Sequence, residues 1–269
     1  MGVAEGPDVV SAALLVIGDE LLSGRTQDVH LAFLAKRLGD RGIQMREARV
    51  VSDDRRCIIE AVNALRRRYD YVFTTGGIGP THDDITSEAV ASAFGRALKR
   101  HPEAERRLLA RFRPDQVNDM RMRMADIPEG ATLIDNPVSV APGFRLENVF
   151  VLAGVPVIAR GMLEGIIEDL KGGQVIDAVT VECDLGEGAV AEDLAALALR
   201  YPELSLGSYP FLLAGAPATR LVARGPEPGA LSEVVAALEA LVAKHGGTPR
   251  RLGGAEAMDS LGDHEKGAA

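Results

Sequence analysis

The most constraining feature of this sequence is a series of short apolar runs that each end at glycines or acidic residues. The run Ala12–Ile17 is followed by Gly-Asp-Glu, and Met45–Val51 ends shortly before two aspartates. Tyr71–Thr74 is a third run, and glycines follow it at once. Runs of this kind are typical of strands buried in a parallel sheet. Helical segments between them predict right-handed crossovers and an α/β fold.

Amphipathic helices are predicted between and after these strands. The first begins near Asp28, and the second begins after Asp53 or Asp54, since aspartate is a common helix cap. A third helix is predicted from Thr86, and a longer one over Gly154–Leu170. The order strand, helix, strand, helix, strand, helix therefore favours a mostly parallel sheet with helices packed on it.

A change of composition at 171–173 (Lys-Gly-Gly) predicts a domain boundary. Residues 9–170 form the predicted α/β domain, and residues 171–247 are predicted to form a small α+β domain. Residues 248–269 lose periodicity and are predicted to be a disordered tail.

Composition excludes several classes of protein. The net charge of −9 argues against a nucleic-acid partner, and the aromatic content of 4% argues against a surface on which bases stack. No apolar run reaches about 18 residues and no signal peptide is evident, so we expect a cytoplasmic protein without a membrane partner. The two cysteines lack the spacing of metal ligands, so no zinc site is predicted.

The strongest functional signal is the segment TTGGIGPTHDDIT, Thr74–Thr86. It lies where a predicted parallel strand ends and a helix begins, which is where open α/β sheets bind ligands. Its glycines let the backbone approach a ligand closely, and bare N–H groups in such a turn favour phosphate. Asp83 and Asp84 would repel a phosphate unless a divalent cation such as Mg²⁺ or Mn²⁺ lies between them. The alternative is a tight turn in which Asp84 caps the next helix.

Acidic residues also follow the other two predicted strands. Asp19 and Glu20 come after the first strand, and Asp53 comes after the second. Because the carboxyl ends of parallel strands meet at one edge of a sheet, we expect these side chains to converge with the glycine segment. For Asp53, a simple helix cap is the alternative. The residues predicted to contact the ligand are Gly18, Thr75, Gly76, Gly77, Gly79, Pro80, Thr81 and His82.

Four segments resemble, in their order along the chain, the molybdopterin-binding (MoaB/MogA-like) superfamily. They are GDELLSG, the VVSDD turn, TTGGIGPTHDDIT and LAGVP, and they are most similar to its CinA-type branch. GGIGPTHDDIT, together with GSYP at Gly207–Pro210, resembles the pterin-binding-type domain of eukaryotic FAD synthases. The resemblance spans roughly Ala12 to His245. It implies a three-layer α/β/α sandwich, a nucleotide or pterin ligand and a homo-oligomer.

The resemblance further implies a metal-dependent nucleotide pyrophosphatase that acts on ADP-ribose or FAD with Mg²⁺, Mn²⁺ or Co²⁺. Asp83, Asp84 and Asp19 would bind the metal. One of Asp53, Asp84 or Glu20 would orient or deprotonate the attacking water. Two other functions stay open: molybdopterin binding or adenylylation, and a non-catalytic nucleotide- or pterin-binding module. The sequence carries neither a CinA deamidase domain nor an FAD synthetase domain. We therefore expect neither amide hydrolysis of pyridine nucleotides nor adenylyl transfer to FMN.

Overall fold

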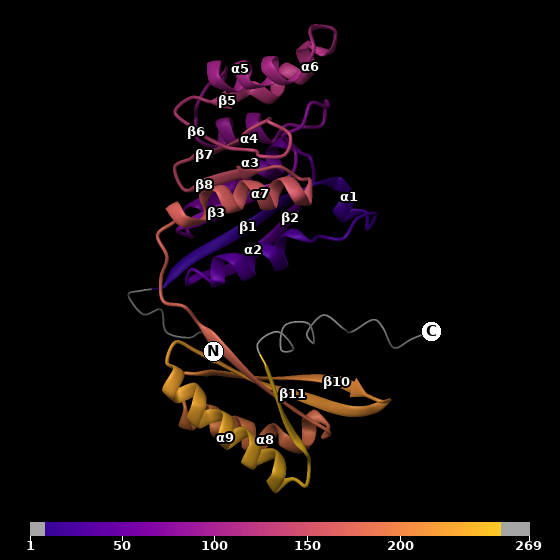
Figure 1. Cartoon of the computed structure of the whole chain (residues 1–269), viewed down its shortest axis with the longest axis vertical. Helices are drawn as coiled ribbons and strands as arrows, with labels where there is room; N and C mark the ends of the chain where they lie inside the picture. Colours follow the sequence, from indigo (N-terminus) through magenta and orange to yellow (C-terminus); the bar gives the residue numbers. More distant parts are fainter. Residues whose placement is uncertain (1–8, 254–269) are drawn as a thin grey trace. The chain divides into compact units, whose positions relative to one another are not determined.

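The computed structural model describes residues 9–253, which belong to two compact units. The N-terminal unit ends at Gln174, and the C-terminal unit begins at Val175. The division therefore falls four residues beyond the boundary that composition predicts. Figure 1 shows the helices and strands of both units.

A six-stranded sheet forms the centre of the N-terminal unit, in the order β2-β1-β3-β8-β7-β6. Its first four strands run parallel, whereas β7 is antiparallel to β8 and β6 is antiparallel to β7. The mostly parallel sheet that the sequence predicts is thus confirmed. The six strands are β1 (Val10–Ile17), β2 (Ile43–Val51), β3 (Tyr71–Thr75), β6 (Thr132–Ile134), β7 (Gly143–Leu146) and β8 (Val149–Leu152).

Helices cover both faces of this sheet, as Figure 1 shows. The odd-numbered residues of β1 from Ala13 to Ile17 pack with α3 (Arg55–Arg66) and α4 (Thr86–Ala93). The even-numbered residues of the same strand pack with α2 (His30–Gly39) and α7 (Pro156–Ile166). Side chains alternate across a strand, so a strand apolar on both sides needs two helical layers. The unit is the predicted three-layer α/β/α sandwich.

Local hydrogen bonds determine where two of the helices begin. Asp28 accepts hydrogen bonds from the backbone N–H groups of His30 (3.1 Å) and Leu31 (3.0 Å), at the start of α2. Asp54 caps α3 by accepting a hydrogen bond from the N–H of Cys57 at 2.9 Å. The neighbouring Asp53 is therefore not the cap of this helix.

Residues 98–128 form an excursion with a two-stranded sheet of its own, and a small apolar cluster fixes its helices. The elements of the excursion are β4 (Leu98–Arg100), α5 (Pro102–Arg111), η1 (Pro114–Gln116), α6 (Asp119–Met122), η2 (Arg123–Ala125) and β5 (Asp126–Pro128). Two short helices elsewhere complete the unit, α1 (Asp19–Leu22) and η3 (Ile167–Asp169).

The C-terminal unit is a four-stranded antiparallel sheet, in the order β10-β11-β9-β12, with two helices packed on one face. This confirms the predicted small α+β domain. Its elements are β9 (Asp177–Cys183), α8 (Glu187–Arg200), β10 (Ser205–Leu213), β11 (Ala216–Gly225), α9 (Pro228–Lys244) and β12 (Pro249–Leu252).

The prediction that a disordered tail begins at residue 248 is wrong, because Pro249–Leu252 form the strand β12. This strand pairs with β9, and Arg250 binds Glu182 at 2.9 Å. A four-residue strand is too short to show a period of two, so its partner rather than its own pattern defines it. The remainder of the predicted tail, 254–269, lies outside the described residues.

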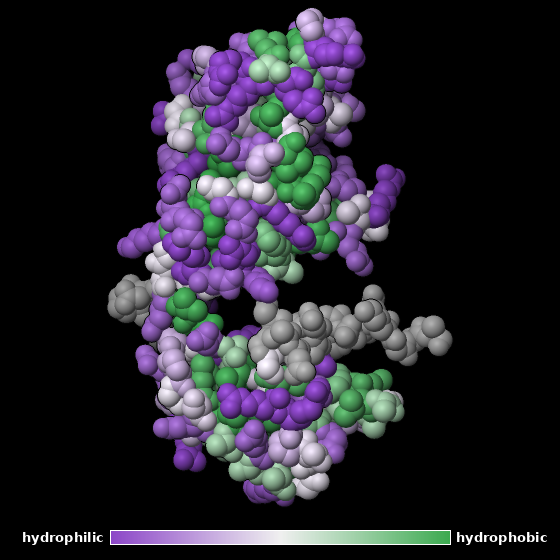
Figure 2. Space-filling model, viewed as in Figure 1, coloured by the Kyte–Doolittle hydropathy of each residue, from purple (hydrophilic) through white to green (hydrophobic). Residues whose placement is uncertain are grey.

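Hydrophilic side chains cover much of the surface that Figure 2 shows. Apolar side chains are exposed at the end of the β10–β11 hairpin, where Leu212 is 71% and Leu213 46% exposed. Within residues 9–253, no helix is both long enough and apolar enough to cross a membrane.

The expected homo-oligomer stays a prediction.

Candidate functional site

A cavity of about 580 Å³ lies at the carboxyl ends of the parallel strands. Each of the four parallel strands is followed by a residue that lines it. Gly18 follows β1, Asp53 follows β2, Gly76 follows β3 and Gly154 follows β8. The predicted convergence of these segments on one edge of the sheet is therefore present in the fold.

A glycine turn forms the floor of this cavity. Gly76 and Gly77 have φ angles of 101° and 67°, a conformation that L side chains rarely adopt. Thr86, at the start of α4, holds the turn from behind. Its hydroxyl donates a hydrogen bond to the carbonyl of Gly76 at 2.9 Å, and its N–H donates to the carbonyl of Gly77 at 3.0 Å. The turn is thus fixed by the fold before any ligand binds.

The Thr86→Val substitution keeps the size of this fully buried side chain but removes its hydroxyl. We expect it to lower the free energy of unfolding of the N-terminal unit by about 1–2 kcal/mol, because the Gly76 carbonyl loses its partner. Urea unfolding measures the loss, and Thr132→Val on the exposed edge of β6 is the matched control. Equal stability of the two variants would show that the hydroxyl does not hold the turn.

Asp84 stabilises the turn itself rather than the next helix. Its carboxylate accepts hydrogen bonds from the N–H of Thr81 at 2.8 Å and from the hydroxyl of the same residue. The cap position of α4 is Ile85, and no side chain caps that helix. The alternative in which Asp84 caps α4 is therefore wrong, and Asp84 lines the cavity beside Asp83.

Asp53 is the acid of the cavity lining whose pKa is raised. Burial raises the pKa of its carboxyl, and the negative charges of Asp19, Glu20 and Asp83 raise it further. The N–H of Asp19 donates a hydrogen bond to Asp53 at 3.0 Å, which opposes this rise in pKa. Carboxylates that follow three different strands therefore lie close enough to influence one another.

The charges of the cavity fit a divalent cation. Among the described residues, those that line it include Glu20, Asp53, Asp83 and Asp84, and none of them is a Lys, Arg or His. Burial is the main cause of the raised pKa of Asp53, and a cation would relieve the repulsion by neighbouring carboxylates that adds to it. Within residues 9–253, no three His, Cys, Asp or Glu side chains are arranged to hold a metal by themselves. A cation here would thus need oxygens from substrate or water as well, as is usual for Mg²⁺.

The structure separates the predicted site residues into two groups. Those that line the cavity are Gly18, Glu20, Asp53, Gly76, Gly77, Gly79, Pro80, Asp83 and Asp84. Those outside its lining are Asp19, Thr75, Thr81 and His82. Thr75 is fully buried in β3, and its hydroxyl has no hydrogen-bond partner among the described residues. The side chain of His82 is 93% exposed, and its imidazole lies 3.9 Å from Asp83.

A loop over residues 135–141 lines the cavity, although none of its residues was predicted to belong to the site. Asn136, which is 8% exposed, donates hydrogen bonds from Nδ2 to the Ser139 hydroxyl (2.6 Å) and the Ala141 carbonyl (2.8 Å). Its Oδ1 accepts hydrogen bonds from two N–H groups of the same loop. The Asn-Pro pair at 136–137 was the available signal, since it favours a turn and loops often carry function.

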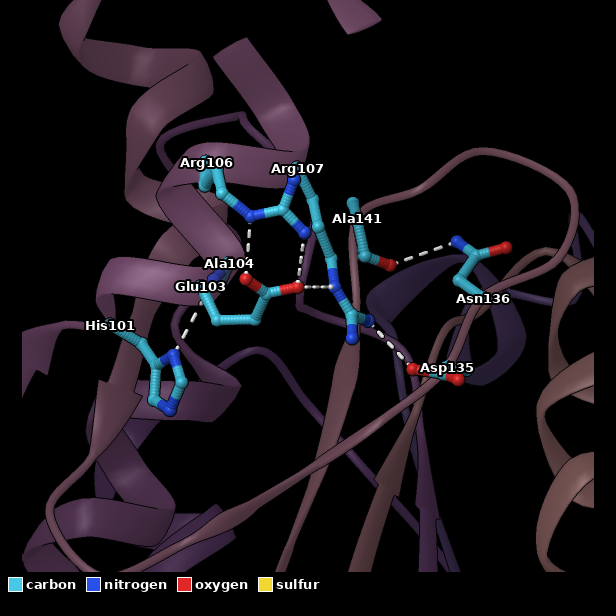
Figure 3. A network of polar contacts seen from close by, with 8 residues as sticks. All are labelled: His101, Glu103, Ala104, Arg106, Arg107, Asp135, Asn136 and Ala141. Atoms are coloured by element: carbon cyan, nitrogen blue, oxygen red, sulfur yellow. Dashed lines mark hydrogen bonds and ion pairs between the residues drawn. The ribbon is translucent and has the colours of Figure 1, made fainter. Parts of the chain in front are cut away.

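Figure 3 shows how α5 supports this loop. Arg107 donates to Glu103 on its own helix at 2.7 Å and to Asp135, at the start of the loop, at 2.6 Å. Hydrogen bonds from Arg106 and Arg107 lower the pKa of Glu103 to about 2. The excursion is therefore tied to one wall of the cavity by the ion pair between Arg107 and Asp135.

Another wall of the cavity is the turn between β8 and α7, and a buried histidine holds it. The side chain of His30, on α2, is 7% exposed, and its Nε2 lies 3.0 Å from the carbonyl oxygen of Gly154. Gly154 lies against the glycine turn, since a Cβ on it would be 3.1 Å from the Cα of Gly76. Helix α2 thus positions the wall on which a ligand would rest.

Comparison with known families places both units. A family described as "Probable molybdopterin binding domain" matches residues 13–172, and one described as "FAD synthase, middle domain" matches residues 178–248. A CinA-like protein of Frankia casuarinae is 35% identical over 246 residues, which cover 85% of this chain and 57% of that protein. A probable FAD synthase of Caenorhabditis elegans is 31% identical over 266 residues, which cover 89% of this chain and 51% of that protein. The chain spans about half the length of these relatives.

A solved structure resembles the N-terminal unit. The crystal structure of CinA from Thermoplasma acidophilum, a protein of unknown function, has a TM-score of 0.57 and 32% sequence identity. The likeness covers 59% of this chain and 96% of the other.

Proposed function

This chain belongs to the family of probable molybdopterin-binding domains, and from that premise we propose that it is a metal-dependent pyrophosphatase for ADP-ribose or FAD. The observation that carries the proposal is the charge of the cavity. Four carboxylates line it, and its described lining has no basic side chain to offset them. The similarity to a probable FAD synthase supports a nucleotide as the ligand.

A diphosphate could not enter this cavity without a positive partner. Two like charges about 4 Å apart repel by roughly 4 kcal/mol at the effective dielectric constant of a protein surface. The N–H groups of the glycine turn carry only partial charges, which are too small to offset several such pairs. A divalent cation held between the carboxylates and the diphosphate removes the repulsion, and this is the usual setting of Mg²⁺ in phosphate sites.

The proposed roles follow from the position of each residue. The cation, when bound, offsets the charge of the diphosphate and polarises phosphorus. Asp83 and Asp84 would hold it at the glycine turn, whose N–H groups would bind phosphate oxygens. Asp53 orients the attacking water and accepts its proton, because a carboxylate with a raised pKa is a stronger base. Val155 and Ile158 offer the nucleotide base an apolar wall.

Incubation of the purified protein with ADP-ribose or FAD and Mg²⁺, Mn²⁺ or Co²⁺ tests the proposal. We expect release of AMP, measured by chromatography, that requires the metal and stops when EDTA is added. No AMP with any metal at high enzyme concentration would contradict a pyrophosphatase.

Molybdopterin binding or adenylylation is the second candidate, and the family match over residues 13–172 favours it. Adenylylated molybdopterin formed from ATP by the purified protein would support this function over hydrolysis. Ligand binding without turnover, unchanged by Asp84→Asn, would instead indicate a non-catalytic module.

A further inference from the structure

We propose that Arg123 binds the phosphate groups of a nucleoside diphosphate above the Ile78–Gly79 turn and supplies the positive side chain that the cavity lining lacks. The inference rests on the proposed function for the chemical class of the ligand. It adds a residue outside the glycine segment and outside the acidic clusters.

Arg123 and Met124 lie on two sides of the same glycine turn. Met124 lines the large cavity, whereas Arg123 lines a neighbouring cavity of about 30 Å³. The two cavities share Ile78, Gly79 and Asp84. Both side chains come from η2, and neighbours on a 3₁₀ helix project about 120° apart because it has three residues per turn. Arg123 therefore follows Met122 and precedes a residue of the large cavity, and its side chain borders the turn that the two cavities share.

Arg123 has no ionic partner in the part of the chain that the structure describes, although its side chain is half-buried. Three carboxylates line its small cavity, yet each is engaged by another group. The pairs are Asp126 with Arg100 at 2.6 Å, Glu88 with Arg55 at 3.2 Å, and Asp84 with the N–H of Thr81 at 2.8 Å. A half-buried guanidinium whose neighbouring acids are all engaged is available for an anion that arrives from outside.

A phosphate group is the anion that this geometry favours. The planar guanidinium binds two oxygens of one phosphate at once, and such charge-assisted bonds are about twice as strong as neutral ones. The turn beside it contains Gly79, which lines both cavities, and the Asp84 carboxylate occupies the place that a side chain on Gly79 would need. Arg123 would then bind the face of the diphosphate that the carboxylates and their cation leave free.

The test measures binding of adenosine α,β-methylene diphosphate in the presence of Mg²⁺ by calorimetry. Its P–C–P bridge cannot be hydrolysed, so binding is read without turnover. We expect Arg123→Gln to weaken binding by about 10- to 100-fold, the loss of one or two charge-assisted bonds, and to leave the affinity for uncharged adenosine unchanged. Arg123→Lys should lie between this variant and the wild type, because it keeps the charge but loses the planar fork.

Arg111→Gln is the matched control, since Arg111 is exposed at the end of α5 and lines neither cavity. It should bind the diphosphate as the wild type does. Equal affinities of Arg123→Gln and Arg111→Gln would overturn the inference, as would a wild type that does not bind the diphosphate. A wild type that binds it but never hydrolyses ADP-ribose would contradict the pyrophosphatase alone, and the loss in Arg123→Gln would still support the phosphate contact.

Discussion

The Gly76→Ala substitution is expected to destabilise the N-terminal unit by more than about 3 kcal/mol and to abolish ligand binding. Two effects add at this position. The φ of 101° is strained for any L side chain, and a Cβ would lie 2.1 Å from the carbonyl oxygen of Ile17. That oxygen belongs to β1, a central strand paired on both sides, so it cannot move away without disturbing the sheet. The whole glycine turn has to shift instead.

Gly95→Ala separates these two effects. Gly95 also has a positive φ, of 62°, but nothing lies within 4 Å of the position of its Cβ. This control should therefore cost only the conformational strain, about 1 kcal/mol. Native-state hydrogen exchange of β1 and β3 measures both variants and assigns the loss to the N-terminal unit. Equal losses in the two variants would show that contact with Ile17 does not restrict position 76.

The predictable parts of the fold are the strands that carry apolar side chains on both faces of the sheet. The buried run in β1 could only be satisfied by two helical layers, so its composition indicates the architecture. The strands β6 and β12 were not recognisable, because three or four residues carry no readable period. Their existence depends on the partners β7 and β9, which pair with them from elsewhere in the chain.

The candidate site divides in the same way. The acids and glycines after the strands were predictable, because parallel strands bring their carboxyl ends together whatever lies between them. Asn136 and Arg123 were not, since each reaches the site through the packing of the excursion at 98–128. For His82, whose neighbours in sequence suggested a ligand contact, the structure shows a side chain exposed to solvent, and the contact stays a prediction.

Asp53→Asn is expected to reduce AMP release by about 10²–10⁴-fold, the contribution of a general base, while it stabilises the ligand-free protein. The stability effect follows from the raised pKa of Asp53, which burial and the nearby carboxylates cause. Folding then favours the protonated carboxyl. Stability is lost as the pH rises from 3.8, the ordinary pKa of an aspartate, through the higher pKa of the folded state. A neutral asparagine escapes this loss and can still accept the hydrogen bond from the N–H of Asp19.

The melting temperature of Asp53→Asn should therefore exceed that of the wild type at neutral pH, and the difference should vanish below about pH 3.8. Asp54→Asn is the matched control. Its carboxylate caps α3 and its pKa is lowered, chiefly by the hydrogen bond from the Cys57 N–H, and asparagine caps almost as well. It should leave both activity and melting temperature close to those of the wild type. If Asp53→Asn is more stable than the wild type and still releases AMP at the normal rate, Asp53 takes no part in the chemistry. If Asp53→Asn lowers activity and raises stability while Asp54→Asn changes neither, the repulsion at Asp53 is retained for catalysis.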